Sequence, residues 1–184
     1  MSDCSAGYDP TRWSSIRTGE TRYRIGVIDG PNMSNMHRRD RSIYGGASIG
    51  DLQGFVQSFG ESIGVETVHL VSNHEGDIIE WIHENADDLD GFLINPAGLT
   101  FTGEPTKWAL ADSNKPYIEV HFRNVVAGKA MAPLGEERRF VFTTAAKGEV
   151  MGFAQYSYTS ALLALVWVLD DPDLSGELSL GQIC

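Results

Sequence analysis

Short apolar runs alternate with stretches of helical periodicity along most of the chain. Five of the runs are rich in β-branched and aromatic residues, which is typical of strands. They lie at 23–28, 65–71, 91–95, 116–120 and 150–153. Between the runs, apolar residues recur three or four positions apart and predict helices. The helical segments lie at about 49–63, 78–86, 105–114 and 157–169.

This alternation indicates the fold class. Strands that alternate with helices form a parallel sheet with both faces covered, so we predict an α/β, flavodoxin-like three-layer fold with a five-stranded parallel sheet. Ser48-x-x-Asp51 reads as the start of a helix that Gly64 ends. Residues 1–22 and 170–184 are polar and show no sustained periodicity. We therefore expect an N-terminal extension (1–22), one domain (23–169) and a C-terminal tail (170–184).

Composition narrows the function classes. The 184 residues suit one domain, and 42% apolar with 21% charged residues is ordinary for a globular protein. No apolar run approaches the roughly 18 residues of a membrane span, and residues 1–12 show no secretory pattern. We expect a cytoplasmic protein without a membrane partner. A net charge of −11 also disfavours nucleic acid.

Several unusual polar residues follow predicted strands. In parallel sheets, ligands bind beyond the carboxyl ends of the strands, near the point where strand order reverses. Residues that follow the first strand, end the third or straddle the end of the fourth are therefore site candidates. They are Asn32, Arg39, Tyr44, Asn95, Glu119 and His121.

Two of these pairs suggest acid–base chemistry. The Arg39 guanidinium would favour the tyrosinate form of Tyr44, which would then be a usable base. Glu119 and His121, two apart on a strand, should point to the same side, where a carboxylate can orient an imidazole. Taken alone, the pairs favour the plainer interpretation, an exposed loop tyrosine and a structural histidine.

Motifs for cofactors and metals are missing. The glycines form neither G-x-G-x-x-G nor a P-loop, and no G-x-S-x-G elbow is present. Cys4 and Cys184 form no C-x-x-C pair. His74 and His83, nine apart, would lie on nearly opposite faces of a helix. We therefore predict no cofactor and no metal ion.

A set of longer motifs resembles one enzyme family. In the order and spacing found in type II 3-dehydroquinate dehydratases, the chain carries Asp29-Gly-Pro-Asn32, Arg39, Ile43-Tyr44-Gly45, Ser72-Asn-His-Glu-Gly76, Trp81-Ile-His83, Asn95-Pro96 and Ile118-Glu-Val-His121. The match covers roughly residues 23–169. The resemblance implies a flavodoxin-like subunit that needs no cofactor and assembles as a homo-oligomer built from trimers, usually a dodecamer.

The resemblance also implies residue roles. Tyr44, helped by Arg39, would remove a proton alpha to a ring ketone, while Asn32 holds a water beside the developing enolate. His121, with Glu119 beside it, would protonate the departing hydroxyl. The positions expected to bind the small cyclic carbonyl substrate are Asn95, Gly98, Phe101, Phe122 and Arg123.

Departures from the family pattern concern the substrate. Phe101 stands where the family has a histidine that contacts ring hydroxyls, and Trp108 where it has an aspartate that reaches a neighbouring subunit. The sequence 123–129 lacks a further histidine, and no arginine clearly matches the family's lid arginine. Because lost hydrogen-bond partners disfavour a polyhydroxylated ring, we expect a substrate less hydroxylated than 3-dehydroquinate. The alternatives are an authentic 3-dehydroquinate dehydratase, a carbon–carbon hydrolase of a cyclic ketone, and a non-catalytic binding protein.

Overall fold

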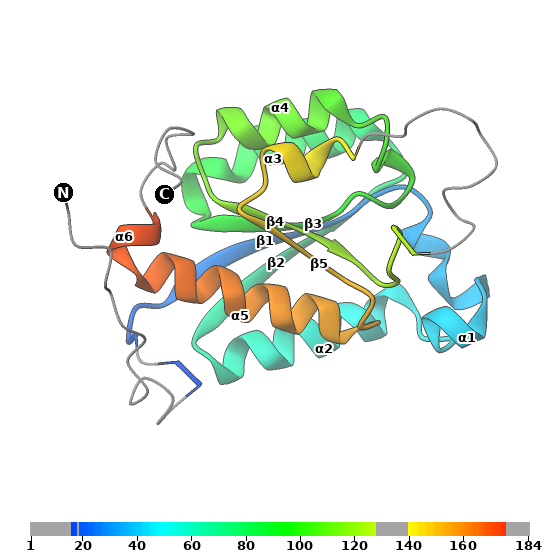
Figure 1. Ribbon diagram of the computed structural model, residues 1–184, viewed down its shortest axis with the longest axis horizontal. Coiled ribbons are helices and arrows are strands. Elements are labelled where there is room, and N and C mark those ends of the chain that lie inside the picture. Colours follow the sequence, from blue (N-terminus) through cyan, green and yellow to red (C-terminus); the bar gives the residue numbers. More distant parts are fainter. Residues whose placement is uncertain (1–15, 18, 128–139, 176–184) are drawn as a thin grey trace.

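The computed structural model describes residues 16–17, 19–127 and 140–175, which form a three-layer α/β structure (Figure 1). All five strands are parallel, in the order β2-β1-β3-β4-β5. The strands are β1 (Tyr23–Asp29), β2 (Val65–Val71), β3 (Gly91–Asn95), β4 (Tyr117–His121) and β5 (Gly148–Met151). The predicted fold class is confirmed.

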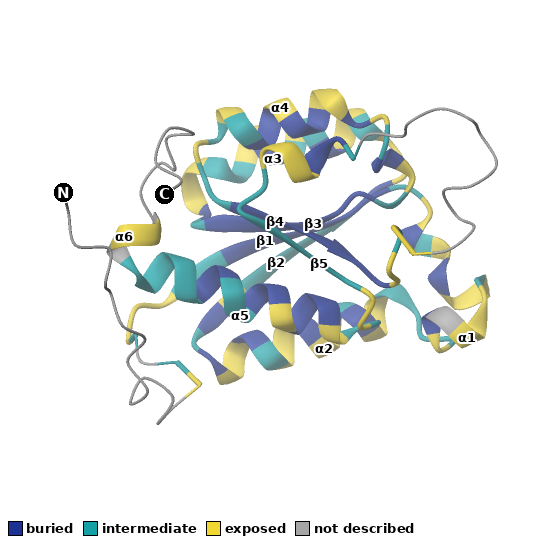
Figure 2. Ribbon diagram, viewed as in Figure 1, coloured by how far each residue is buried: buried dark blue, intermediate teal, exposed yellow. Residues whose placement is uncertain are grey.

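Helices cover both faces of the sheet. α2 and α5 lie on one face, and α3 and α4 lie on the other (Figure 1). The longer helices are α2 (Ile49–Ser62), α3 (Glu75–Asn85), α4 (Glu104–Asp112) and α5 (Tyr156–Asp170). Figure 2 shows that the central strands are buried along most of their length, as their near-continuous apolar sequence predicts. No helix in these described segments is long and apolar enough to cross a membrane.

Local signals fixed most element boundaries. The Ser48 side chain accepts a hydrogen bond from the Asp51 backbone, and the Asp51 carboxylate accepts one from Ser48 in return, which completes a capping box at the start of α2. Gly64 adopts a φ of 76° just after the helix. The fifth strand lies at Gly148–Met151, two residues earlier than expected, because Gly152 with a φ of 94° ends it.

Short helices near the first strand were not predicted. The 3₁₀ helix η2 (Met33–Arg38) and the four-residue α1 (Arg41–Tyr44) follow β1. They are too short to show a helical period in the sequence. His74 is the N-cap residue of α3, and His83 lies in the last turn of this helix.

The two ends of the described chain meet beside α5. The Arg17 guanidinium donates to the Asp170 carboxylate at 2.8 Å and to the Ile63 carbonyl at 2.9 Å, and both charged side chains are largely buried. The Trp167 indole donates to the Ile16 carbonyl. Asp170 ends α5 rather than opening a tail, and a four-residue helix, α6 (Pro172–Ser175), follows it. Much of both predicted extensions falls outside the described residues.

A buried polar network joins the end of β1 to α5. The Tyr158 hydroxyl donates to the Asp29 carboxylate at 2.5 Å and accepts from the Asn95 amide at 2.7 Å. All three side chains are buried. Burial raises the pKa of Asp29 to about 7, although the Tyr158 hydrogen bond opposes this rise. Folding therefore favours the protonated form of this carboxyl.

This network makes stability depend on pH. Because the pKa of Asp29 is higher in the folded chain than in the unfolded chain, its contribution is most favourable below about pH 4 and is lost as pH rises towards about 7. Asp29→Asn, which is neutral at every pH, should be more stable than the original chain at about pH 8, by a few kcal/mol. Urea denaturation across this pH range would measure it, with the exposed Asp88→Asn as control. If the free energy of unfolding of Asp29→Asn fell with rising pH as steeply as that of the original chain, the assignment would be contradicted.

Candidate active site

A cavity of about 220 Å³ lies beyond the carboxyl ends of β1, β3 and β4. This is the sheet edge at which the sequence places the site, next to the point where strand order reverses between β1 and β3. The predicted residues that line it are Asn32, Arg39, Tyr44, Asn95, Gly98, His121, Phe122 and Arg123. Its volume suits a small metabolite rather than a nucleotide.

The charge of the cavity is opposite to that of the protein. Two guanidinium groups, Arg39 and Arg123, and the His121 imidazole line it, and no carboxylate is among the described lining residues. The chain as a whole carries a net charge of −11. A cationic recess on an acidic protein attracts small anions selectively. The cavity therefore suits a small anionic ligand.

Tyr44 is positioned by a short, well-capped helix. The Asp40 carboxylate accepts from the Ser42 backbone at the start of α1, and Gly45, with a φ of 66°, ends it directly after Tyr44. The Tyr44 ring packs on the Phe122 ring with centroids 5.4 Å apart. The Arg39 guanidinium lies over the Tyr44 ring, 4.2 Å from its centroid.

Burial and charge act in opposite directions on Tyr44. Burial raises the pKa of Tyr44 above its usual value, and the charges of Arg39 and Arg123 lower it without cancelling the rise. Arg39 thus favours tyrosinate, as expected, but burial has the larger effect on the pKa of Tyr44. The resting phenol is protonated at neutral pH.

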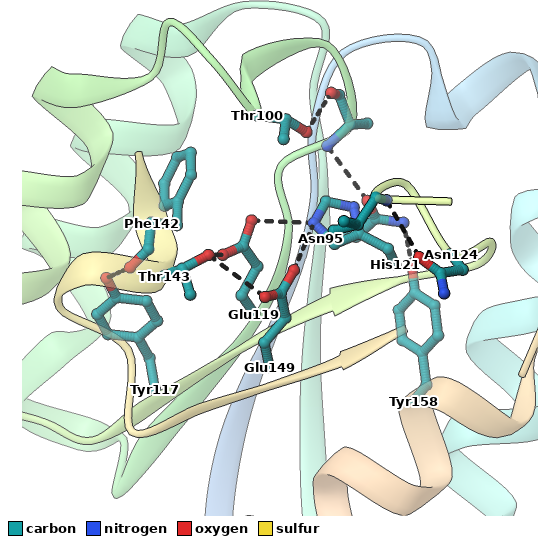
Figure 3. A network of polar contacts seen from close by, with 12 residues as sticks. Asn95, Thr100, Tyr117, Glu119, His121, Asn124, Phe142, Thr143, Glu149 and Tyr158 are labelled. Carbon is teal, nitrogen blue, oxygen red and sulfur yellow. Dashed lines mark hydrogen bonds and ion pairs between the residues drawn. The ribbon is translucent and has the colours of Figure 1, made fainter. Parts of the chain in front are cut away.

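His121 is backed by a fully buried carboxylate. Glu119 and His121 lie two residues apart on β4 and point to the same side, which confirms the prediction from strand periodicity (Figure 3). The His121 Nε2 and Glu119 Oε1 atoms are 2.9 Å apart. The Thr143 hydroxyl donates to the other oxygen of Glu119. With Nε2 engaged in this way, Nδ1 is the His121 nitrogen left for a ligand.

A second carboxylate, which the sequence did not identify, faces the same imidazole. The Glu149 Oε1 atom lies 3.7 Å from His121 Nε2 (Figure 3). Glu119, His121 and Glu149 offer ligand atoms within 4.8 Å of one another, a spacing that a metal ion could bridge. Since His121 and Glu119 already satisfy each other by a hydrogen bond, we interpret the cluster as an acid–base group. The expected absence of a metal ion stays a prediction.

Two of the four described non-glycine residues with a positive φ lie at the cavity. Asn32 and Ala97, both non-glycine residues, adopt φ values of 77° and 48°. Asn32 follows β1 and is held by a hydrogen bond from its backbone to Asn73. Gly98 approaches Pro31 so closely that an added Cβ would lie 3.1 Å from the Pro31 side chain. These turns bring the backbone of the strand ends against the cavity wall.

Not every predicted residue lines the cavity. Glu119 lies behind His121, and Phe101 is not among the lining residues, so its part in binding stays a prediction. Thr100 occupies the lining position instead, and the half-buried Phe101 ring packs edge-on against Phe140 with centroids 5.2 Å apart. Trp108 is exposed on α4. The family's lid arginine would follow shortly after residues 123–129, and residues 128–139 lie outside the described part of the chain.

For Arg123, the sequence is compatible both with a side chain that turns into the site and with an outward, solvated one. Its side chain is exposed, yet it lines the cavity and its charge lowers the pKa of both Tyr44 and Asp40. This agrees with the inward alternative. Asn95 lines the cavity too, but its amide donates to Tyr158, so part of its hydrogen-bonding capacity is used within the protein.

Comparison with known proteins gives a consistent result. The family described as dehydroquinase class II matches residues 23–166. The chain is 35% identical over 142 residues to the 3-dehydroquinate dehydratase of Halalkalibacterium halodurans, covering 77% of this chain and 94% of the relative. It is 33% identical over 146 residues to that of Halothermothrix orenii, covering 79% and 95%.

Solved structures agree. The crystal structure of type II dehydroquinase from Butyrivibrio crossotus superposes with a TM-score of 0.70 at 29% identity, covering 79% of this chain and 98% of that one. The corresponding structure from Propionibacterium acnes gives a TM-score of 0.69 at 28% identity, covering 83% and 100%. The similarity therefore extends over nearly the whole length of these relatives.

The opposing effects on Tyr44 can be separated experimentally. Arg39→Gln removes the charge but keeps most of the side-chain volume, so the pKa of Tyr44 should rise further, by about one unit. An NMR titration of labelled tyrosine rings would measure this, with the Tyr44 signal assigned by its loss in Tyr44→Phe. Arg38→Ala, at an exposed neighbouring position, is the control. If the Tyr44 titration did not move in Arg39→Gln, Arg39 would have no part in activating this tyrosine.

Proposed function

The chain belongs to the dehydroquinase class II family, and from this premise we propose that it is a hydro-lyase that removes water from a cyclic ketone bearing a carboxylate. The observation that carries the proposal is the placement of a candidate base and a candidate acid on one small cationic cavity. Tyr44 lies under Arg39, and His121 is hydrogen-bonded to Glu119. Elimination of water from a β-hydroxy ketone requires such a pair.

The proposed step uses only groups of this chain. The Tyr44 phenolate takes the proton alpha to the ketone, and the electron pair of that C–H bond moves into an enolate beside Asn32. The enolate expels the β-hydroxyl as its C–O bond breaks, and His121 supplies a proton so that water leaves. The product is a conjugated enone. Tyr44 then returns its proton, and His121 regains one, through solvent.

The substrate is proposed to be less hydroxylated than 3-dehydroquinate. The support is the loss of polar partners at Phe101 and Trp108 and the apolar side chains of Met33, Ala97 and Val125 on the cavity wall. Because Phe101 lies outside the lining, its effect on the ring would be indirect, through Phe140 and Thr100. The second candidate, an authentic 3-dehydroquinate dehydratase, is favoured by the names of the relatives and by the retained acid and base.

An absorbance assay for the conjugated enone separates these candidates. We expect 3-dehydroquinate to be turned over far more slowly than about 10 per second, and ring analogues lacking one hydroxyl to be turned over faster. Phe101→His alone should not restore 3-dehydroquinate turnover. An ordinary rate with 3-dehydroquinate would favour the authentic enzyme. Mass spectrometry of the product would identify a hydrolase, because hydrolysis adds water whereas elimination removes it.

The role of Tyr44 is tested with whichever ring is turned over. Tyr44→Phe should lower the rate at least about 10³-fold, because the base is lost while the ring that packs on Phe122 remains. Tyr156→Phe removes an exposed phenol and should leave the rate unchanged. Circular dichroism would verify that both variants fold. A Tyr44→Phe enzyme with ordinary activity would remove the basis of the mechanism.

On the basis of the family, we also propose that the chain assembles from trimers into a dodecamer. Exposed aromatic side chains support this, since Phe55 and Tyr156 contact each other at the surface and Phe153 is exposed nearby in the sequence. Light scattering should find a species several times heavier than the 20.2 kDa chain. A monomer at micromolar concentration would contradict the assembly.

A further inference from the structure

We infer that Glu149 is a positioning residue that acts with Glu119 from the Nε2 side of His121, where the two carboxylates orient the imidazole and stabilise the positive charge that it carries as the acid. The inference rests on the proposed function of His121 as the acid. It concerns a carboxylate that lines no part of the cavity and touches no substrate. Glu149 acts through His121, from the side of the imidazole that faces away from the ligand.

The sheet register places the two carboxylates together. Glu119 on β4 and Glu149 on β5 are direct partners in the parallel ladder, so their side chains leave the sheet on the same side. Figure 3 shows both carboxylates directed at the His121 ring, and the atom that each approaches is Nε2. The Oε1 atoms lie 2.9 Å and 3.7 Å from it. Two carboxylates that approach one atom repel each other unless a positive charge lies between them.

Apart from His121, few groups offset the negative charge of the Glu149 carboxylate. Its Oε1 atom is buried and accepts no hydrogen bond. Its Oε2 atom lies 3.5 Å from the Thr143 hydroxyl, which has one proton and lies closer to Glu119. Burial and the charge of Glu119 raise the pKa of Glu149, whereas His121 lowers it. A buried carboxylate without a good donor is costly unless a positive charge is nearby, and the imidazolium supplies that charge.

The charged groups on the cavity side of His121 oppose a positive charge on its imidazole. Arg39 and Arg123 line the same cavity and disfavour a third positive charge there. Tyr44, also on the cavity, and Tyr117, beside Glu119, have raised pKa values and are neutral. With Glu119 alone, one negative charge on the far side of the imidazole would oppose two guanidinium groups on the cavity side. The second carboxylate balances the charges, which is the physical reason for assigning it a role.

The test compares Glu149→Gln with Glu84→Gln, an exposed position on α3. In an NMR titration of labelled histidine, with the His121 signal assigned by its loss in His121→Asn, Glu149→Gln should release the His121 proton at a pH lower by about one unit. Glu84→Gln should behave as the original chain. This measurement needs no substrate, so it decides the inference even if the proposed reaction fails. An unmoved His121 titration would overturn it.

A second variant separates charge from packing. Glu149→Asp keeps the charge but shortens the side chain, whereas Glu149→Gln keeps the shape and loses the charge. If the charge matters, the basic limb of the pH–rate profile moves to lower pH in Glu149→Gln and stays close to its original position in Glu149→Asp. The rate at low pH is preserved in both. The reverse pattern, a harmless Gln and a damaging Asp, would make Glu149 a packing residue and would overturn the inference.

Discussion

Parallel pairing of β1, β3 and β4 is the constraint on which the site depends. Parallel strands end at the same edge, so the polar residues that close each strand meet there although they are far apart in the chain. Asp29 pairs with Asn95 in the ladder, and His121 ends the next strand. The cavity lies at this edge, between strand ends whose turns are held in strained backbone conformations at Asn32 and Ala97. The packed core behind the edge keeps those turns in place.

Charge is distributed across His121 in two layers. The ligand side carries guanidinium groups and suits an anion, while the side towards β5 carries carboxylates. An imidazole between these layers can bear a proton without leaving either set of charges uncompensated. Separation of the layers matters because a carboxylate within the cavity would repel an acidic substrate. The sheet provides it, since Glu119 and Glu149 are neighbours in register and lie behind His121.

Burial opposes the ionisation of two side chains, Asp29 and Tyr44. Burial raises the pKa of Asp29 to about 7 within its polar network, and burial also raises the pKa of Tyr44. Each group would ionise at a lower free-energy cost in solvent. In the proposed mechanism Tyr44 must ionise, so the guanidinium groups of Arg39 and Arg123 offset a penalty that the packing of the site imposes. Reactive groups near neutrality commonly require such opposing effects.

The sequence by itself determined the local features. Apolar periodicity located the five strands and the long helices, the Ser48–Asp51 capping box fixed the start of α2, and a period of two put Glu119 and His121 on one side of β4. The family motifs indicated the residues of the cavity, and most of them line it. The predictions of strands, helix ends and strand faces succeeded because each depends on neighbours within a few positions along the chain.

Tertiary structure alone decided the rest. Glu149 is thirty positions from Glu119, and only the pairing of β4 with β5 makes them partners. The exclusion of Phe101 from the cavity depends on a turn in which Thr100 takes the lining position. The net direction of the Tyr44 pKa depends on how deeply the ring is packed as well as on the charges beside it. Periodicity tells which face of a strand is buried, but strand partners and desolvation arise from packing between distant segments.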